Sequence, residues 1–322
     1  MIPIRESADE NKQNESSPIP YPPMPKLITI FSAPKPFTNP HINVIQRNAI
    51  QSWIHLGEVV EVFLIGEEDG LAEVTQQYGI AHLPAVKRNE QGTPLVSSIF
   101  TLARQASNAP LLGYVNGDIL LLPDLIQAAR FLIHSTNRFL LISQRWDLEV
   151  KELLDFSKGW EERLSVVVKQ RGRLHPPAGS DLFVFRREDF VDIPDFTIGR
   201  AGWDNWMIYH ACQSGLSVID GTPSITVIHQ DHDYSHLPGG RPHYDLEESE
   251  QNLNLAGGMR AMYYILDSHY QLKNGKLVRP PLTTLRLLRK IELALLPPED
   301  RRRGWRWWLA RRFRRARRFR MG

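Results

Sequence analysis

Cysteine is almost absent from this chain: Cys212 is the only one in 322 residues. A single thiol excludes an internal disulfide and is typical of proteins from reducing compartments. Long apolar runs are absent as well, because no uninterrupted stretch of about 18 apolar residues occurs, so we expect no membrane-spanning helix. The first fifteen residues include four acidic side chains and no apolar core, so we expect no secretory signal peptide.

Acidic side chains are absent from the last 22 residues, which contain 11 arginines. Without these 11, the 39 basic residues fall to 28, so residues 1–300 have a net charge of −8 against their 36 acids. A tail of charge +11 on an acidic body indicates that the tail has an anionic partner of its own. The 42% hydrophobic content is enough for a large core in one or two domains.

Residues 26–123 alternate between short apolar strands and amphipathic helices. This alternation predicts an α/β fold, a three-layer α/β/α sandwich with a mostly parallel central sheet. Residues 1–25 are polar and proline-rich, and we expect them to form a disordered arm. Strands are expected at 26–31, 59–65, 80–83 and 111–115, and helices at 41–56, 71–78 and 94–106.

Beyond residue 123 the alternation is less regular. We expect residues 246–300 to form a C-terminal helical segment, followed by the arginine-rich tail at 301–322. Before these, helices are expected at 124–134, 147–170 and 203–214, and strands at 139–144, 182–185 and 224–228.

Two short acidic segments follow apolar ones. Asn116-Gly117-Asp118 comes directly after the strand at 111–115, at a strand end of the kind where open α/β sheets bind ligands. Taken alone, Asn-Gly between apolar runs would predict a hairpin, but the helices expected on both sides favour a strand between helices. Asp118 is therefore a candidate ligand for a divalent metal. Asp204 opens the helix at 203–214, where the ordinary role of an aspartate is a cap or a dipole partner.

From Lys26 to about His236, the order and spacing of these segments resemble the GT-A nucleotide-sugar glycosyltransferases. Asn116-Gly117-Asp118 is similar to the metal-binding acidic motif of that family, and Gly179-Ser180-Asp181 to the entry of its acceptor-side strand. Gly202-Trp203-Asp204-Asn205 is similar to the acidic motif behind the acceptor site. Two departures are that Asn116 stands where the family usually has Asp, and that Asp204 stands alone where many relatives have two adjacent acids.

The resemblance implies one catalytic domain at 26–245, with a Rossmann-like nucleotide-binding half at 26–123 and an acceptor half at 124–245. A Mn²⁺ or Mg²⁺ ion bound by Asp118 and His229, with His232 as the alternate ligand, would neutralise the leaving diphosphate. Asp204 would be the general base for the acceptor hydroxyl, and uridine is the expected base of the donor. The expected nucleotide-sugar site consists of Ser32, Ala33, Glu67, Asp69, Arg88, Asn116, Gly117, Asp118, Ser180, Asp181 and Arg241.

Four histidines and two aspartates lie between residues 229 and 243, so a zinc hydrolase is an alternative. Their spacing lacks the helical His-Glu-x-x-His arrangement and no cysteine contributes, which counts against zinc chemistry. Another alternative is that these are polar loop residues that only form hydrogen bonds with their neighbours.

The tail has the pattern of a basic amphipathic helix. Its aromatic face and its arginines are typical of a helix that lies in a membrane interface. Nucleic acid is the rival partner, since an arginine-rich arm binds phosphates without reading sequence, but three tryptophans favour the membrane. We therefore expect a cytoplasmic protein bound to the inner membrane face. The apolar arc, roughly 140° wide at 100° per residue, contains Trp305, Trp308, Leu309, Phe313, Ala316 and Phe319.

Three functional hypotheses follow from these patterns. The first is a membrane-associated glycosyltransferase with a lipid-linked or cell-envelope acceptor. The second, a sugar nucleotidyltransferase, would be expected to have a glycine-rich phosphate loop after the first strand, where this chain has Ser32-Ala33-Pro34-Lys35-Pro36. The third is a non-catalytic protein that binds nucleotide sugars or nucleic acid.

Overall fold

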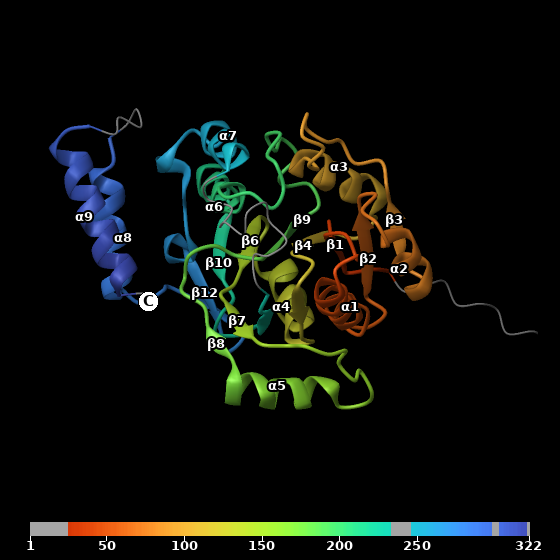
Figure 1. Ribbon diagram of the computed structural model, residues 1–322. Coiled ribbons are helices and arrows are strands. Elements are labelled where there is room, and N and C mark those ends of the chain that lie inside the picture. Colours follow the sequence, from red (N-terminus) through yellow and green to blue (C-terminus); the bar gives the residue numbers. More distant parts are fainter. Residues whose placement is uncertain (1–24, 233–245, 298–302, 321–322) are drawn as a thin grey trace, which may run out of the picture.

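The structure, a computed structural model, describes residues 25–232, 246–297 and 303–320 (Figure 1). Arg241 and most of the expected N-terminal arm lie outside these ranges. A large sheet runs through the described part of the chain, and helices pack on both of its faces. The predicted three-layer α/β/α sandwich is confirmed.

The central sheet has nine strands in the order β13-β12-β10-β6-β9-β4-β1-β2-β3. Neighbouring strands are parallel except in the pairs that involve β9 or β13, which confirms the mostly parallel sheet. The strands are β1 (Ile28–Ser32), β2 (Val60–Ile65), β3 (Ala81–Leu83), β4 (Leu111–Val115), β6 (Phe139–Ile142), β9 (Leu182–Arg186), β10 (Ser217–Asp220), β12 (Tyr270–Lys273) and β13 (Lys276–Val278).

An apolar core lies on each face of the central sheet, between the sheet and the helices that cover it. Side chains alternate across each strand, so Ile28 and Ile30 of β1 enter one core while Phe31 enters the other. Three helices bury apolar residues in the first core: α1 (Pro40–Ile54), α2 (Leu71–Tyr78) and α4 (Asp124–Ser135). Two helices do so in the second: α3 (Val96–Ala106) and α6 (Trp203–Gln213).

A second, four-stranded sheet has the order β5-β11-β7-β8. Helix α5 (Trp160–Arg171) packs against it through Trp160 and Leu164. The strands are β5 (Ile119–Leu121), β11 (Val227–Gln230), β7 (Arg145–Leu148) and β8 (Arg173–Leu174).

Three expectations for the second half are corrected. The helix expected at 147–170 begins only at Trp160, because Arg145–Leu148 pairs with β11 and this tertiary pairing overrides local helix propensity. Strand β10, which was not expected, lies between β6 and β12. The segment 246–300, expected to be helical, also contributes β12 and β13 to the central sheet.

The strand order places the predicted motifs at one end of the central sheet, where β1 and β4 finish. Parallel β1 and β4 are neighbours, so the loops after Ser32 and Val115 leave the sheet on the same side. Antiparallel β9 begins at that end, with Leu182 opposite Val115. The backbone amide of Asn116 donates to the Asp181 carbonyl (3.1 Å). The motifs at 116–118 and 179–181 are therefore adjacent.

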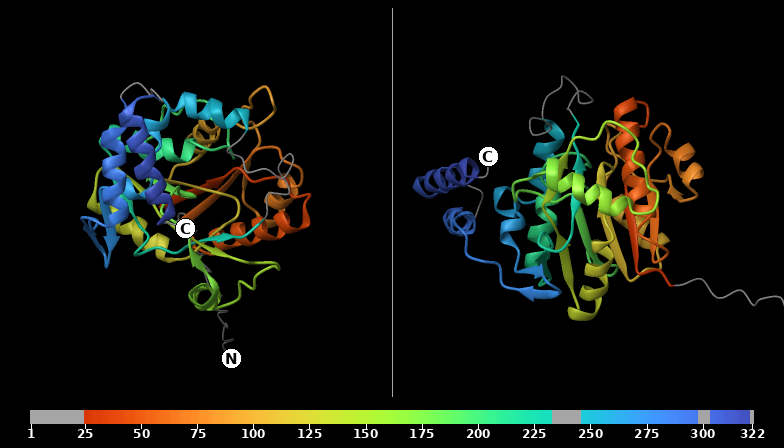
Figure 2. Two further views of the ribbon diagram at one scale, coloured as in Figure 1. Left: turned by 60° about the vertical axis from the view of Figure 1, so that its left-hand side comes forward. Right: turned by 90° about the horizontal axis from the view of Figure 1, so that it is seen from below.

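Two helices at the end of the chain, α8 (Thr284–Leu295) and α9 (Trp305–Phe319), lie side by side at the edge of the molecule (Figures 1 and 2). The segment that leads to them contains α7 (Glu247–Leu255) and the short 3₁₀ helices η3 (Met259–Ala261) and η4 (Ile265–Asp267). Within the described ranges, no helix has the length and hydropathy needed to cross a bilayer.

Candidate active site

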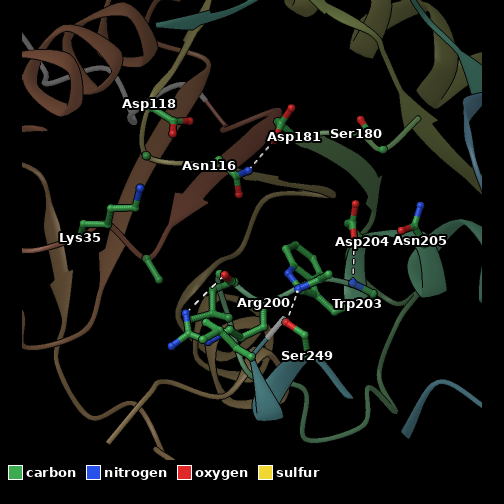
Figure 3. A pocket seen from close by; sticks show the side chains of 18 of the residues that line it. Lys35, Asn116, Asp118, Ser180, Asp181, Arg200, Trp203, Asp204, Asn205 and Ser249 are labelled. Atoms are coloured by element: carbon green, nitrogen blue, oxygen red, sulfur yellow. Dashed lines mark hydrogen bonds between the residues drawn. The ribbon is translucent and has the colours of Figure 1, made fainter. Parts of the chain in front are cut away.

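A cleft of about 1470 Å³ opens beside the carboxyl ends of β1 and β4. Residues 33–36 and 116–118 line one side of it, and residues 178–181, 198–205 and α7 line the other. Figure 3 shows Lys35 and Asp118 on the first side and Asp204 with Asn205 on the second. The two acidic segments singled out in the sequence thus share one cavity.

The Asp118 carboxylate is a partly compensated, mostly buried charge. Its Oδ2 lies 3.0 Å from Nε2 of His232 and 3.8 Å from Nε2 of His229. Burial alone would raise the pKa of Asp118, but the charges of His229 and Lys35 and the hydrogen bond from His232 hold it well below its usual value. The other oxygen, Oδ1, is buried and has no hydrogen-bond partner among the described residues.

These three side chains fit a divalent metal. One ligand atom from each of Asp118, His229 and His232 lies within 4.8 Å of the others. A carboxylate with imidazole nitrogens suits a transition metal such as Mn²⁺, and the partnerless Oδ1 would gain the contact that it lacks. The structure brings Asp118 together with both His229 and the expected alternate, His232.

The His229 ring lies between the Asp118 carboxylate on one side and those of Asp147 and Asp231 on the other. Its Nδ1 is 3.4 Å from Oδ1 of Asp147 and 3.5 Å from Oδ1 of Asp231, on the opposite side of the ring from Asp118. The strand register explains the contact, because His229 of β11 pairs directly with Asp147 of β7. Burial alone would lower the pKa of His229, but the neighbouring carboxylates raise it to about 9. Asp147 is thus placed to orient the imidazole and to fix which nitrogen faces Asp118.

Asn116 has a structural role in place of the carboxylate usual for the resembled motif. Its side-chain amide donates to Oδ1 of Asp181 (2.7 Å) and its carbonyl oxygen accepts from the Tyr114 hydroxyl (2.9 Å). The other oxygen of Asp181 pairs with Arg145 (2.8 Å). An aspartate at position 116 would face the Asp181 carboxylate, so the neutral side chain avoids a like-charge contact.

Asp204 lies in the first turn of α6 at the wall of the cleft. Its Oδ1 accepts from the Gly202 amide at 3.3 Å, so the capping role expected for an aspartate here is present but weak. Burial, together with repulsion by Asp181, raises the pKa of Asp204 to about 6. A Cβ on Gly179 would stand 2.5 Å from Oδ2 of Asp204, so only glycine lets the carboxylate occupy this position.

The structure does not bring every expected residue to the cleft. Glu68 lines it, whereas the flanking Glu67 and Asp69 do not. Arg88 does not line the cleft but pairs with Glu68, which does (2.9 Å), and Ser32 is buried in β1. Of the remaining expected residues, the lining includes Ala33, Asn116, Gly117, Asp118, Ser180 and Asp181.

Lys35 is a cleft residue that the sequence analysis did not single out. The Gln46 side chain clamps its backbone, accepting from the Lys35 amide (2.7 Å) and donating to the Lys35 carbonyl (2.9 Å). Burial lowers the pKa of Lys35, and the charge of Asp118 opposes that effect. A lysine in the loop after the first strand was the available signal, since such loops face the crevice of an α/β sheet.

Replacing Asp118 tests the metal assignment. We expect Asp118→Ala to weaken Mn²⁺-dependent UDP binding by more than about 100-fold. Removing a residue that only orients a metal ligand lowers metal affinity by at most about that factor. Isothermal titration with UDP and Mn²⁺ measures it, and Asp192→Ala, at an exposed position outside the cleft, is the control. Unchanged affinity in Asp118→Ala would exclude Asp118 as a ligand.

Replacing Asp147 tests whether it orients His229. We expect Asp147→Asn to lower the Mn²⁺ affinity by about 10- to 100-fold without removing any ligand atom. Asp231→Asn is the matched control, because Asp231 is a similar distance from the same nitrogen but more exposed (37% against 14%) and should matter less. Mn²⁺ titration followed by electron paramagnetic resonance provides the measurement, and equal affinities in Asp147→Asn and the wild type would contradict the assignment.

No protein-family model matches the sequence, and no curated protein matches it either. Among solved structures, the chain is similar to a glucosyl-3-phosphoglycerate synthase from Mycobacterium tuberculosis in complex with Mn²⁺, UDP and phosphoglyceric acid, with 14% identity, 73% of this chain and 80% of that chain covered, and a TM-score of 0.45. It is also similar to a mannosyltransferase from Pyrobaculum calidifontis in complex with GDP-Man and Mn²⁺, with 14% identity, coverage of 91% and 76%, and a TM-score of 0.47. At this identity the similarity concerns architecture, whereas the chemistry depends on the side chains of the cleft.

Proposed function

We propose that this protein is a metal-assisted glycosyltransferase that transfers a sugar from a nucleotide-sugar donor, with UDP as the expected carrier. One observation carries the proposal: the cluster of Asp118, His229 and His232 shares a cleft with Asp204, on the opposite side (Figure 3). A site for a diphosphate-bound metal, facing a carboxylate with a raised pKa across the cleft, suits the transfer of a sugar to a hydroxyl group.

On the donor side, the chain's own residues bind and orient the leaving group. Asp118, His229 and His232 would hold a divalent ion, which would supply positive charge to the diphosphate oxygens. The Lys35 ammonium lines the same side and adds a second cation. Asn116, fixed by Asp181, keeps the turn that carries Asp118 in place.

On the acceptor side, Asp204 removes the proton of the attacking hydroxyl. A carboxyl group with a pKa of about 6 is ionised at neutral pH and is a stronger base than an ordinary aspartate. The hydroxyl oxygen attacks the anomeric carbon as the bond to the diphosphate breaks. A single displacement of this kind inverts the anomeric centre.

We further propose that α9 binds the enzyme to an anionic membrane surface, where the acceptor is a lipid-linked or cell-envelope molecule. The support is the orientation of the helix: Trp305, Trp308 and Phe319 are 69%, 56% and 87% exposed. The opposite side of α9 packs inward through Ala310 and Arg317. Exposed aromatics among arginines are the features by which a helix enters an anionic interface.

The pH dependence of transfer tests the base. Because Asp204 acts only when ionised, we expect kcat/KM to fall about tenfold per pH unit below about pH 6. Asp204→Asn should lower transfer by about 10²- to 10⁴-fold and leave UDP binding intact. The measurement is a pH profile of transfer to a soluble sugar acceptor, chosen by screening.

The melting temperature of Asp204→Asn distinguishes two roles of Asp204, general base and helix cap. The folded-state pKa of Asp204 is raised above its usual 3.8, so its contribution to stability is present at acid pH and is lost as pH rises through about 6. Asp204→Asn should therefore not lower the melting temperature at pH 7.5. Near wild-type transfer with a lower melting temperature would mean that Asp204 is only a cap.

Vesicle binding tests the membrane proposal. Replacing Trp305, Trp308 and Phe319 together with Ser should lower affinity for anionic vesicles by about 100-fold in high salt, since burying each aromatic contributes on the order of 1 kcal/mol that salt does not remove. Val191→Ser, at a position 62% exposed outside α9, is the control in vesicle sedimentation. A full-length protein that retards RNA on a gel and does not sediment with vesicles would overturn the membrane proposal.

A further inference from the structure

The last turn of α9 forms part of the cleft. Arg317 and Arg318 line the same cavity as Met259, Met262 and Tyr264. A Cβ on Gly202 would lie 3.8 Å from the sulfur of Met262, so these residues extend the side that carries Asp204, which the proposed function assigns to the acceptor. The arginine-rich helix is therefore a wall of the site as well as an outer surface.

A buried charge network holds this wall in place. Glu292 of α8 is fully buried and pairs with Arg314 (2.7 Å) and Arg317 (3.1 Å) of α9. The Tyr264 ring lies between two guanidinium groups, those of Arg289 and Arg317, each 4.6 Å from its centroid. Moving α9 away would leave a buried charge of this network without its partner, so the position of α9 is well determined.

The charge on this part of the wall is not balanced. Glu292 compensates Arg317, but no described carboxylate pairs with Arg318. The acidic side chains that line the acceptor side are Asp181, Asp204, Glu247 and Glu250, and among the described residues no ion pair joins any of them to Arg318. An exposed guanidinium at the rim of a cleft is suited to a phosphate, which it can bind through two parallel hydrogen bonds.

The cavity that Arg318 lines also has apolar residues in its wall. Leu253, Met259 and Met262 line it together with Arg318. Methionine side chains adapt to flexible apolar ligands. A cation beside an apolar wall is complementary to an amphiphile with an anionic head and a hydrocarbon chain.

We propose that this part of the cleft binds the lipid phosphate of an acceptor sugar linked to an alkyl phosphate, so that a hydroxyl of the sugar faces Asp204. Arg318 is the phosphate ligand, and Leu253, Met259 and Met262 contact the alkyl chain. The inference rests on the proposed function, because Asp204 defines the acceptor side. It also assigns a role in acceptor binding to each side of α9. The outward aromatics contact the bilayer that contains the lipid, while the inward end meets its head group.

Binding of a short prenyl phosphate tests this site without any turnover. Farnesyl phosphate below its micellar concentration, farnesol and inorganic phosphate are titrated separately against the full-length protein in equilibrium dialysis, without vesicles. We expect farnesyl phosphate to bind more tightly than either fragment. Arg318→Ala should lower its affinity about tenfold, the size expected for one charge-assisted contact, and leave farnesol binding unchanged.

Arg315→Ala is the matched control, since Arg315 is an exposed arginine of the same helix that does not line the cleft. Equal losses in the two variants, or equal affinities for farnesyl phosphate and farnesol, would overturn the proposal. Tight binding of inorganic phosphate alone would instead identify a site for soluble phosphorylated acceptors and would also contradict the lipid. UDP titration with Mn²⁺ on the same samples reports separately on the donor site. A failure of the proposed donor site is therefore distinguished from a failure of the lipid-phosphate site.

Discussion

The compensation of the Asp118 carboxylate is the constraint on which the rest of the cleft depends. A charge placed at a strand end and mostly buried needs partners, and these come from His229 and His232, far away in the sequence. The four-stranded sheet delivers them, because β11 pairs with β5 on one side and with β7 on the other. The same register brings Asp147 to the far side of the His229 ring. The small sheet that contributes Ile119, Leu121 and Val227 to one core therefore also assembles the candidate metal ligands.

The two sides of the cleft are joined by a continuous series of polar contacts. Asn116 donates to Asp181, Asp181 pairs with Arg145, and Arg145 pairs with Asp147. Asp181 in turn contributes to the raised pKa of Asp204. One carboxylate thus influences both the turn that carries Asp118, the candidate metal ligand, and the candidate base Asp204. The asparagine at position 116 is consistent with this arrangement, since a second negative charge there would face Asp181 directly.

Charge compensation also explains how a strongly basic helix becomes part of the folded domain. Fully buried Glu292 attracts Arg314 and Arg317, while Arg289 completes the network from its own helix. Buried ion pairs of this kind often contribute little net stability, yet they determine orientation because any other arrangement leaves a charge unpaired. The orientation they impose turns Trp305, Trp308 and Phe319 outward.

The sequence by itself determined the α/β class, the parallel character of the sheet and the strand-end position of Asp118, because apolar periodicity and turn residues are local signals. It also indicated Asp204 and the amphipathic tail. Only the tertiary structure decided that Glu68 rather than Glu67 or Asp69 faces the cleft and that Arg145–Leu148 is a strand. It also decided that Lys35 and Arg318 line the cleft and that Asp147 contacts His229. Those facts depend on strand register and on contacts between segments distant in the chain, and local patterns do not encode such pairings.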